Sequence, residues 1–400
     1  MTTPAPIRRD PRKVVLDAPE KEFLRRLILY GFFLRVALAL LLHWTGYSRV
    51  LAPDEQTYQE DGWVIALYWM GEILTRPWRY TTGQPVGYFQ LNAAFFYVFG
   101  RTEIPIKIAN SLVGAFSCIY CYRLARELYG VPIARRTATL FEFLPSLVLW
   151  SALNIRDVWV VFLLIFLAWK SVDVYIGRSK TAILQFLVGV LLLSQFRDYL
   201  FYIVMIPPLV AFVIGRRGHL ARNFLFAAIT ACAAVFLLQE GVVGEASQSR
   251  MSLEAVSQAR QQMATGGSAF SENVDISTPE AALFFLPTGL AYFLFSPFPW
   301  QITSALKVIS LPEMLLLYYL TPYVFRGIVW TIRERFRESL QVLLLTALIT
   351  VSYALGSGNV GTMYRHRAQV IVFYLMFGAV GLQTRQVESV PRQRVISPAR

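Results

Sequence analysis

Two adjacent carboxylates, Asp54 and Glu55, follow the first long apolar run of this 400-residue sequence. They lie in the stretch 48–58, on the side of that run away from a strongly basic N-terminal segment. A carboxylate at a membrane surface can take the proton from a hydroxyl group as that hydroxyl attacks another molecule. We therefore take Asp54 and Glu55 as the candidate catalytic residues.

Further charged residues stand at the ends of later apolar runs, on the same side of the membrane in the topology given below: Asp157, Arg197, Arg365 and Arg367. A guanidinium group matches the geometry of a phosphate through two parallel N–H donors, which a lysine cannot provide. The three arginines are therefore candidates for binding the phosphate of a lipid.

Each of these residues also has a structural interpretation. Asp54 and Glu55 follow Pro53 and suit the first turn of a helix. Asp157 and Arg197 each have a neighbour of opposite charge, so they can be solvated pairs at helix ends. Arg365 and Arg367 can reach toward lipid headgroups instead of a substrate.

Metal and nucleotide chemistry have little support in the sequence. No cluster of His, Cys and carboxylate residues has metal-ligand spacing, so no built-in zinc site is expected. The three cysteines lie within apolar runs, where helix packing explains them. A divalent cation such as Mg²⁺ or Mn²⁺ held by Asp54 or Glu55 is left open. There is no glycine-rich phosphate loop, so the use of cytosolic ATP is not indicated.

The elements that must position these residues are membrane helices. The sequence is 56% hydrophobic and 16% charged, which is more apolar surface than a soluble core can bury. We predict an all-α polytopic membrane protein with about ten transmembrane helices, and up to twelve. The net charge of +13 sits in short clusters between apolar runs, so the positive-inside rule explains it better than nucleic-acid binding.

That rule gives a consistent topology. Residues 1–26 form a basic cytoplasmic tail, 27–384 the membrane domain, and 385–400 a second basic cytoplasmic tail. The outer face carries a first long loop at 45–104, with an amphipathic helix around 63–73, and a second at 240–305, with partial helix around 252–263. The expected spans are 27–44, 108–122, 137–153, 158–175, 182–196, 199–214, 224–238, 311–325, 340–355 and 369–382.

Two shorter apolar segments, 87–99 and 281–295, complicate the count. If either segment crossed the membrane fully, the basic clusters that follow would fall on the outer side, against the charge rule. We therefore interpret both segments as juxtamembrane or half-crossing helices on the outer face.

A family resemblance becomes specific at the acidic pair. Asp54 and Glu55 in the first outer loop, Tyr58 three positions on, and Gln84-Pro85 before a short apolar helix resemble the GT-C superfamily of polyprenyl-phosphate-sugar glycosyltransferases. The protein O-mannosyltransferases and the lipid A aminoarabinose transferases are among its members. The likeness continues to Tyr364-Arg365-His366-Arg367 and covers most of the chain. Relatives often have His-Pro-Pro or Lys-Pro where this chain has Gln84-Pro85.

The resemblance implies an inverting transferase of the cell envelope. The donor would be a sugar on a polyprenyl phosphate, and the acceptor a hydroxyl of a glycan, lipid or protein. The active site would lie on the outer face of the cytoplasmic membrane. Asp54 would be the general base, and Glu55 and Asp157 would orient the acceptor or a cation. Tyr58 and Gln84 would then contact substrate, together with Asp157, Arg197, Arg365 and Arg367.

Two other function classes stay open. A secondary transporter or flippase of lipid-linked sugars would favour internal repeats and broken helices in mid-membrane, and no convincing repeat is present. An oligosaccharide polymerase or ligase would rely on outer-face arginines without needing an early acidic pair. Substituting Asp54 and the arginines separately discriminates among the three classes.

Overall fold

The structure is a computed structural model, and it describes residues 16–82, 84–176, 181–214, 252–264, 269–271, 274–302 and 305–389. Within these ranges the chain is built from helices, and the β-structure is one isolated bridge between Ala269 and Asn359. The predicted all-α fold is therefore confirmed. The predicted span at 224–238 lies outside the described residues, as do most of both terminal tails.

Among the described helices, five are long and apolar enough to cross a membrane: α1 (Ala18–Thr45), α5 (Ile104–Tyr129), α8 (Asp157–Ile176), α15 (Ala305–Glu334) and α16 (Phe336–Gly356). Four shorter apolar helices accompany them: α9 (Ala182–Phe196), α10 (Asp198–Ile214), α14 (Pro279–Phe295) and α18 (Ile371–Ser389). The chain is a polytopic membrane protein, as its composition predicted.

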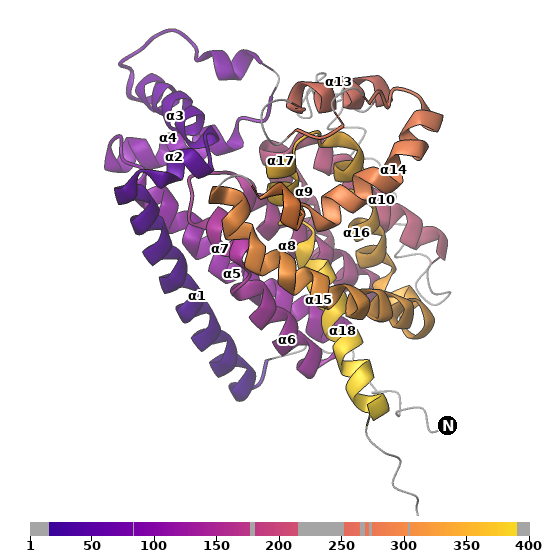
Figure 1. Cartoon of the computed structure of the whole chain (residues 1–400). Helices are drawn as coiled ribbons and strands as arrows, with labels where there is room; N and C mark the ends of the chain where they lie inside the picture. Colours follow the sequence, from indigo (N-terminus) through magenta and orange to yellow (C-terminus); the bar gives the residue numbers. More distant parts are fainter. Residues whose placement is uncertain are drawn as a thin grey trace, which may run out of the picture.

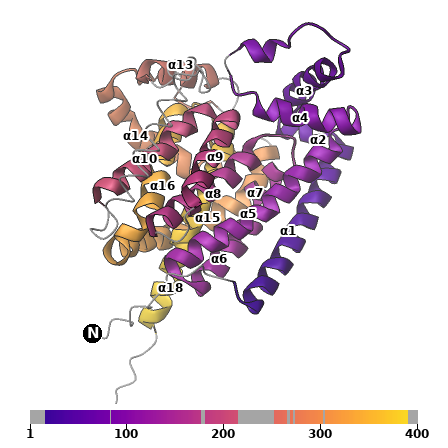
Figure 2. The same ribbon diagram turned by 180° about the vertical axis from the view of Figure 1, so that it is seen from behind.

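Five further helices gather at one end of this bundle, which we call the site end (Figure 1). They are α2 (Tyr47–Leu51), α3 (Asp54–Met70), α4 (Gly87–Phe99), α13 (Leu253–Met263) and α17 (Val360–Arg367). At the opposite end, which we call the basic end, α1 begins and α18 finishes (Figure 2). The arginine-rich starts and ends of α1, α5, α6 (Val131–Glu142) and α15 meet there.

One expected span is divided in two. The segment 137–153 was predicted as a continuous crossing, but it forms the end of α6 and a separate helix, α7 (Pro145–Ser151). Leu144 between them is extended, with φ −66° and ψ 126°. Pro145 explains the break, because a proline disfavours helical geometry in the residue before it and has no N–H for the hydrogen-bond ladder.

The acidic pair opens a longer helix than expected. The amphipathic helix predicted around 63–73 is α3, and it begins at Asp54 and ends at Met70. Helix α4 packs along α3 at the site end (Figure 1). With 13 residues, α4 is roughly 20 Å long, shorter than a hydrocarbon core of about 30 Å. That length agrees with a juxtamembrane position, which stays a prediction.

Helices α15 and α18 approach one another until their backbones touch. A Cβ atom placed on Gly327 would lie 1.9 Å from the carbonyl oxygen of Phe377, and one on Gly381 would lie 2.0 Å from that of Tyr323. Membrane helices pack closely where small residues face each other. This contact joins α18 firmly to the bundle. In the sequence, α18 follows α17 directly, and α17 carries residues of the candidate site.

Candidate functional site

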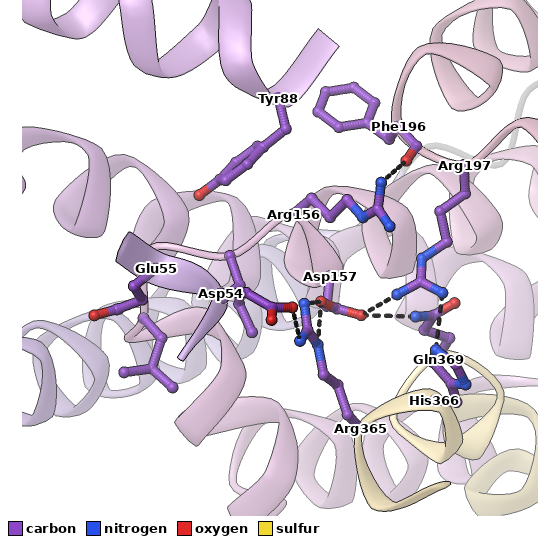
Figure 3. Close-up of polar contacts among 12 residues, drawn as sticks. Asp54, Glu55, Tyr88, Arg156, Asp157, Phe196, Arg197, Arg365, His366 and Gln369 are labelled. Carbon is purple, nitrogen blue, oxygen red and sulfur yellow. Dashed lines mark hydrogen bonds and ion pairs between the residues drawn. The ribbon is translucent and has the colours of Figure 1, made fainter. Parts of the chain in front are cut away.

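Four loop and helix-end positions converge at the site end (Figure 3). Asp54 opens α3, Asp157 opens α8, Arg197 follows the end of α9, and Arg365 and His366 lie in α17. These residues come from distant parts of the sequence, so the helix bundle itself brings them together. The structure therefore joins four of the predicted site residues: Asp54, Asp157, Arg197 and Arg365.

Asp157 is the buried centre of the cluster, with a side chain 1% exposed. Its Oδ2 accepts from Nε of Arg365 at 2.6 Å and contacts Nη2 of the same arginine at 2.5 Å. Its Oδ1 accepts from Nη2 of Arg197 at 2.9 Å and from Nε2 of Gln369 at 2.8 Å. Three charge-assisted contacts from two arginines, and one from an amide, therefore use both carboxylate oxygens.

Asp54 is the accessible member of the cluster. Its side chain is 53% exposed, and its Oδ2 accepts from Nη1 of Arg365 at 2.6 Å. The same guanidinium thus joins Asp54 to Asp157, as Figure 3 shows. Because Asp157 fixes the far side of Arg365, the arginine holds the exposed carboxylate in a defined position while one face of Asp54 stays open.

Aromatic and histidine side chains surround Arg197. Its Nη1 donates to the hydroxyl of Tyr199 at 2.6 Å and to Nε2 of His366 at 2.9 Å. The ring of His366 stacks on that of Tyr353, with centroids 4.3 Å apart, and the Tyr353 hydroxyl donates to Gln369. The aromatic rings restrict the orientation of Arg197, and the cluster continues into α16.

The electrostatics of α17 follow from these contacts. Burial acts to lower the pKa of Arg365, but the opposing charges of Asp157 and Asp54 outweigh it, so the net shift is upward. For His366, burial and then the positive charge of Arg197 lower the pKa well below its usual value. His366 is therefore neutral, which fits a ring nitrogen that accepts from Arg197.

Glu55 faces away from this cluster, although it is next to Asp54 in the sequence. Its Oε2 pairs with Nζ of Lys107 at 3.2 Å, and its Oε1 accepts from the backbone N–H of Asn154 at 2.5 Å. Lys107 also pairs with Glu103 at 2.9 Å. These groups are buried, so Glu55 ties α3 to α5 and to the loop before α8.

Three other predicted residues lie outside the arginine–aspartate contacts. Tyr58 is buried with its ring against Tyr88 and Phe89. Gln84 is exposed. Arg367 is buried on another side of α17, where it donates to the carbonyl oxygens of Phe293 and Leu294 in α14.

Several residues of the site were missed or undervalued from the sequence. Arg156 entered only as the charged neighbour of Asp157, but it donates to the carbonyl oxygen of Phe196 at 3.0 Å and its Nε is buried without a partner. His366 was named only as part of the motif 364–367. Tyr199, Tyr353 and Gln369 were not singled out. Their signal was weak, because each is a single polar residue beside or within an apolar run.

The donor set does not fit a resident divalent cation. The described residues contain no group of three or more His, Cys, Asp or Glu side chains that could hold a metal ion. Mg²⁺ and Mn²⁺ need several free oxygen ligands, but both oxygens of Asp157 and both oxygens of Glu55 are taken, which leaves the open face of Asp54. The guanidinium of Arg365 supplies positive charge between the two aspartates.

Comparison with known proteins agrees with this architecture. Residues 83–239 match the profile of the family described as dolichyl-phosphate-mannose-protein mannosyltransferase. No curated protein sequence matches the chain significantly. Two structures of the oligosaccharyltransferase of Archaeoglobus fulgidus share the fold. The apo form has a TM-score of 0.57, and the form "in complex with an inhibitory peptide and a dolichol-phosphate" has 0.54.

Both structural matches have 12% sequence identity and cover 93% of this chain but 51% of the archaeal protein. The chain therefore spans about half the length of the structures it matches. The chain shares the helix arrangement of the archaeal oligosaccharyltransferase, and the family profile covers residues 83–239 of it.

Proposed function

We propose that this protein is a glycosyltransferase that moves a sugar from a polyprenyl-phosphate donor to an acceptor hydroxyl. The observation that carries this proposal is the exposed Asp54 carboxylate, held by an arginine that is itself anchored on the buried Asp157. An accessible base beside fixed cations is what transfer from a lipid phosphate requires.

In this mechanism Asp54 takes the proton of the acceptor hydroxyl as its oxygen bonds to the anomeric carbon. The bond from that carbon to the phosphate oxygen breaks, and the phosphate leaves with the bonding electrons. Attack opposite the leaving group inverts the anomeric configuration. Arg365 holds Asp54 in place, and Asp157 orients both Arg365 and Arg197.

The leaving phosphate needs N–H donors that are still free. The Nε groups of Arg156 and Arg197 are buried without partners. Both arginines lie on the side of Asp157 away from Asp54 (Figure 3). We propose that they bind the phosphate, which adds Arg156 to the set predicted from the sequence. Tyr58 and Gln84 stay predicted substrate contacts.

The distribution of charge favours one orientation of the bundle in the membrane. The basic end gathers arginines from α1, α5, α6 and α15, so the positive-inside rule favours the cytoplasm for that end. The site end then faces outward from a bacterial-type cytoplasmic membrane. The archaeal neighbour with bound dolichol-phosphate and peptide supports a prenyl-phosphate donor and a protein acceptor among the candidates.

The first test measures transfer of labelled sugar from a panel of polyprenyl-phosphate sugars to membrane acceptors by wild type and Asp54→Asn in the same detergent. We expect the variant to lose at least about 10²-fold in rate with unchanged melting, because asparagine cannot accept the proton.

Asp61→Asn is the matched control, because Asp61 is also an aspartate of α3 that pairs with an arginine, Arg79, at 2.6 Å. It should retain transfer. A folded Asp54→Asn protein with wild-type turnover would show that Asp54 is not the base. Loss of activity with the arginine variants alone would favour a polymerase, and binding of lipid-linked sugar without turnover by any variant would favour a transporter.

A further inference from the structure

A groove opens on the flank of the bundle at the basic end, far from the candidate site. It lies between the first turns of α1 and the length of α6, and its volume is about 550 Å³. We call it the α1–α6 groove. Its lining combines charged residues, Glu22, Arg26 and Arg135, with apolar and aromatic ones such as Phe23, Tyr30 and Phe143.

The polar and apolar parts of the groove are separated along the helix axes. Both α1 and α6 start at the basic end and run toward the site end (Figure 1). Arg26 is one turn before Tyr30 in α1, and Arg135 precedes Phe143 by roughly 12 Å at 1.5 Å per residue. The arginines therefore lie at the mouth of the groove together with Phe23, and Tyr30 and Phe143 lie deeper in the membrane.

The mouth carries a net positive charge. Glu22 pairs with both Arg25 and Arg26, at 2.7 and 2.6 Å, so one carboxylate serves two arginines. Arg135 lies over the ring of Phe23, with its Cζ 5.3 Å from the ring centroid. Among the lining residues, two guanidinium groups and one carboxylate thus leave an excess of one positive charge at headgroup depth, and Arg25 adds a further guanidinium beside Glu22.

The deeper walls are exposed to the hydrocarbon region. Tyr30 is 66% exposed and Phe143 is 42% exposed. A soluble anion would use the arginines but not these apolar walls, whereas a lipid with an anionic headgroup would use both. We propose that the α1–α6 groove binds one anionic phospholipid of the adjacent leaflet, with its phosphate between Arg26 and Arg135.

A second groove at the same end has a similar lining. It has a volume of about 450 Å³ and lies between α15 and α18, where Phe325 and Trp330 accompany Arg326, Arg333 and Glu334. Two separate helix pairs therefore offer arginines beside aromatic walls. This repetition is expected of a surface adapted to a charged leaflet.

The test uses the full chain purified in a non-ionic detergent. Native mass spectrometry would count bound phosphatidylglycerol, with phosphatidylcholine of identical acyl chains for comparison. We expect the wild type to retain phosphatidylglycerol selectively and the double variant Arg26→Gln/Arg135→Gln to retain one molecule fewer. Its affinity for that molecule should fall by about thirtyfold, since each arginine contributes about fivefold.

Two further variants make the result specific to the groove. Thr139→Trp fills the groove without changing charge, because Thr139 lines it and is exposed, and it should also remove one lipid. If the double variant does not fold, Thr139→Trp alone tests whether the lipid binds in the α1–α6 groove. Arg101→Gln removes an exposed arginine just before α5, at the site end, and should retain the wild-type number.

Three outcomes would overturn the proposal. The first is equal retention of phosphatidylcholine, and the second is wild-type stoichiometry in both groove variants. The third is displacement of the lipid by glycerol phosphate at similar concentration, which would identify a site for soluble anions. None of these readouts depends on sugar transfer, so they stand apart from the test of the proposed enzyme.

Discussion

Asp54 and Glu55 are neighbours in the chain but belong to different networks, because successive residues in a helix point about 100° apart. Asp54 reaches the exposed face and Arg365, whereas Glu55 enters the interior and meets Lys107. The two adjacent carboxylates therefore have different roles. Asp54 has the accessibility of a base, and Glu55 has the contacts of a structural residue.

The two roles can be separated with Glu55→Gln. This change removes a buried charge opposite Lys107, which keeps Glu103 as a partner, so we expect a loss of about 1–3 kcal/mol in stability. Transfer by the folded fraction should stay near the wild-type rate. Thermal unfolding and the transfer assay on the same preparation check both statements. Lost transfer with normal melting would instead make Glu55 the reacting carboxylate.

The position of Arg365 between two carboxylates leads to a second prediction. Because a guanidinium already bridges Asp54 and Asp157, transfer should continue in the presence of a strong chelator of divalent cations. Arg365→Ala should lower the rate by about 10²-fold or more, since removal of one preorganised donor has an effect of that size.

Arg365→Lys should not restore this rate, because a lysine cannot contact both aspartates in the same geometry. Assays with chelator, with chelator and excess Mn²⁺, and with neither would measure the effect. Full inhibition by the chelator and recovery with Mn²⁺ would show that a metal ion is required.

At the scale of the element, the contact of α15 with α18 determines how the end of the chain joins the bundle. Gly381→Ala would place a methyl group 2.0 Å from the carbonyl oxygen of Tyr323 if nothing moved. The helices must separate, so we expect a loss of about 1–3 kcal/mol in stability. Thermal unfolding in detergent is the measurement.

Gly378→Ala on the same helix is the control. A Cβ atom there would lie 3.3 Å from a side-chain carbon of Val324, which can yield slightly. Its melting temperature should stay close to that of the wild type. Equal effects of the two substitutions would show that helix propensity, and not the backbone contact, decides the outcome.

At the scale of the whole molecule, the two ends should face opposite compartments. Arg101→Cys at the site end should react with a membrane-impermeant maleimide in intact cells, and Arg333→Cys at the basic end should react only after permeabilisation. Cys118 and Cys121 are buried, and replacing Cys232 by serine removes the remaining background. The reverse labelling pattern would place the site in the cytoplasm.

Much of this architecture follows from the sequence, since long apolar runs between basic clusters predict membrane helices. The all-α class, the short helix at 87–99 and the positions of Asp54 and Asp157 at helix starts could be predicted in this way. The break before Pro145 was also readable, because proline restricts the preceding residue. The prediction of one continuous span at 137–153 was wrong, because it rested on hydropathy and did not take account of Pro145.

The partners of each charge could not be predicted. Arg365 and Arg367 are two residues apart, and nothing in their spacing tells which one meets the aspartates. That choice depends on the rotation of α17, which is set by its packing against α14 and α16. Tyr353 and Gln369 joined the site for the same reason, since each is a lone polar residue whose neighbours are defined only in three dimensions.

Helix α17 holds one arginine contact on each side of its axis. Arg365 reaches Asp54 and Asp157, while Arg367 fastens to the carbonyl oxygens at the end of α14. These eight residues thus connect the candidate site to the end of α14. We expect a displacement of that end of α14 to reach Arg365 through α17, so a ligand bound at α14 would change the contacts of Asp54 and Asp157 without entering the candidate site.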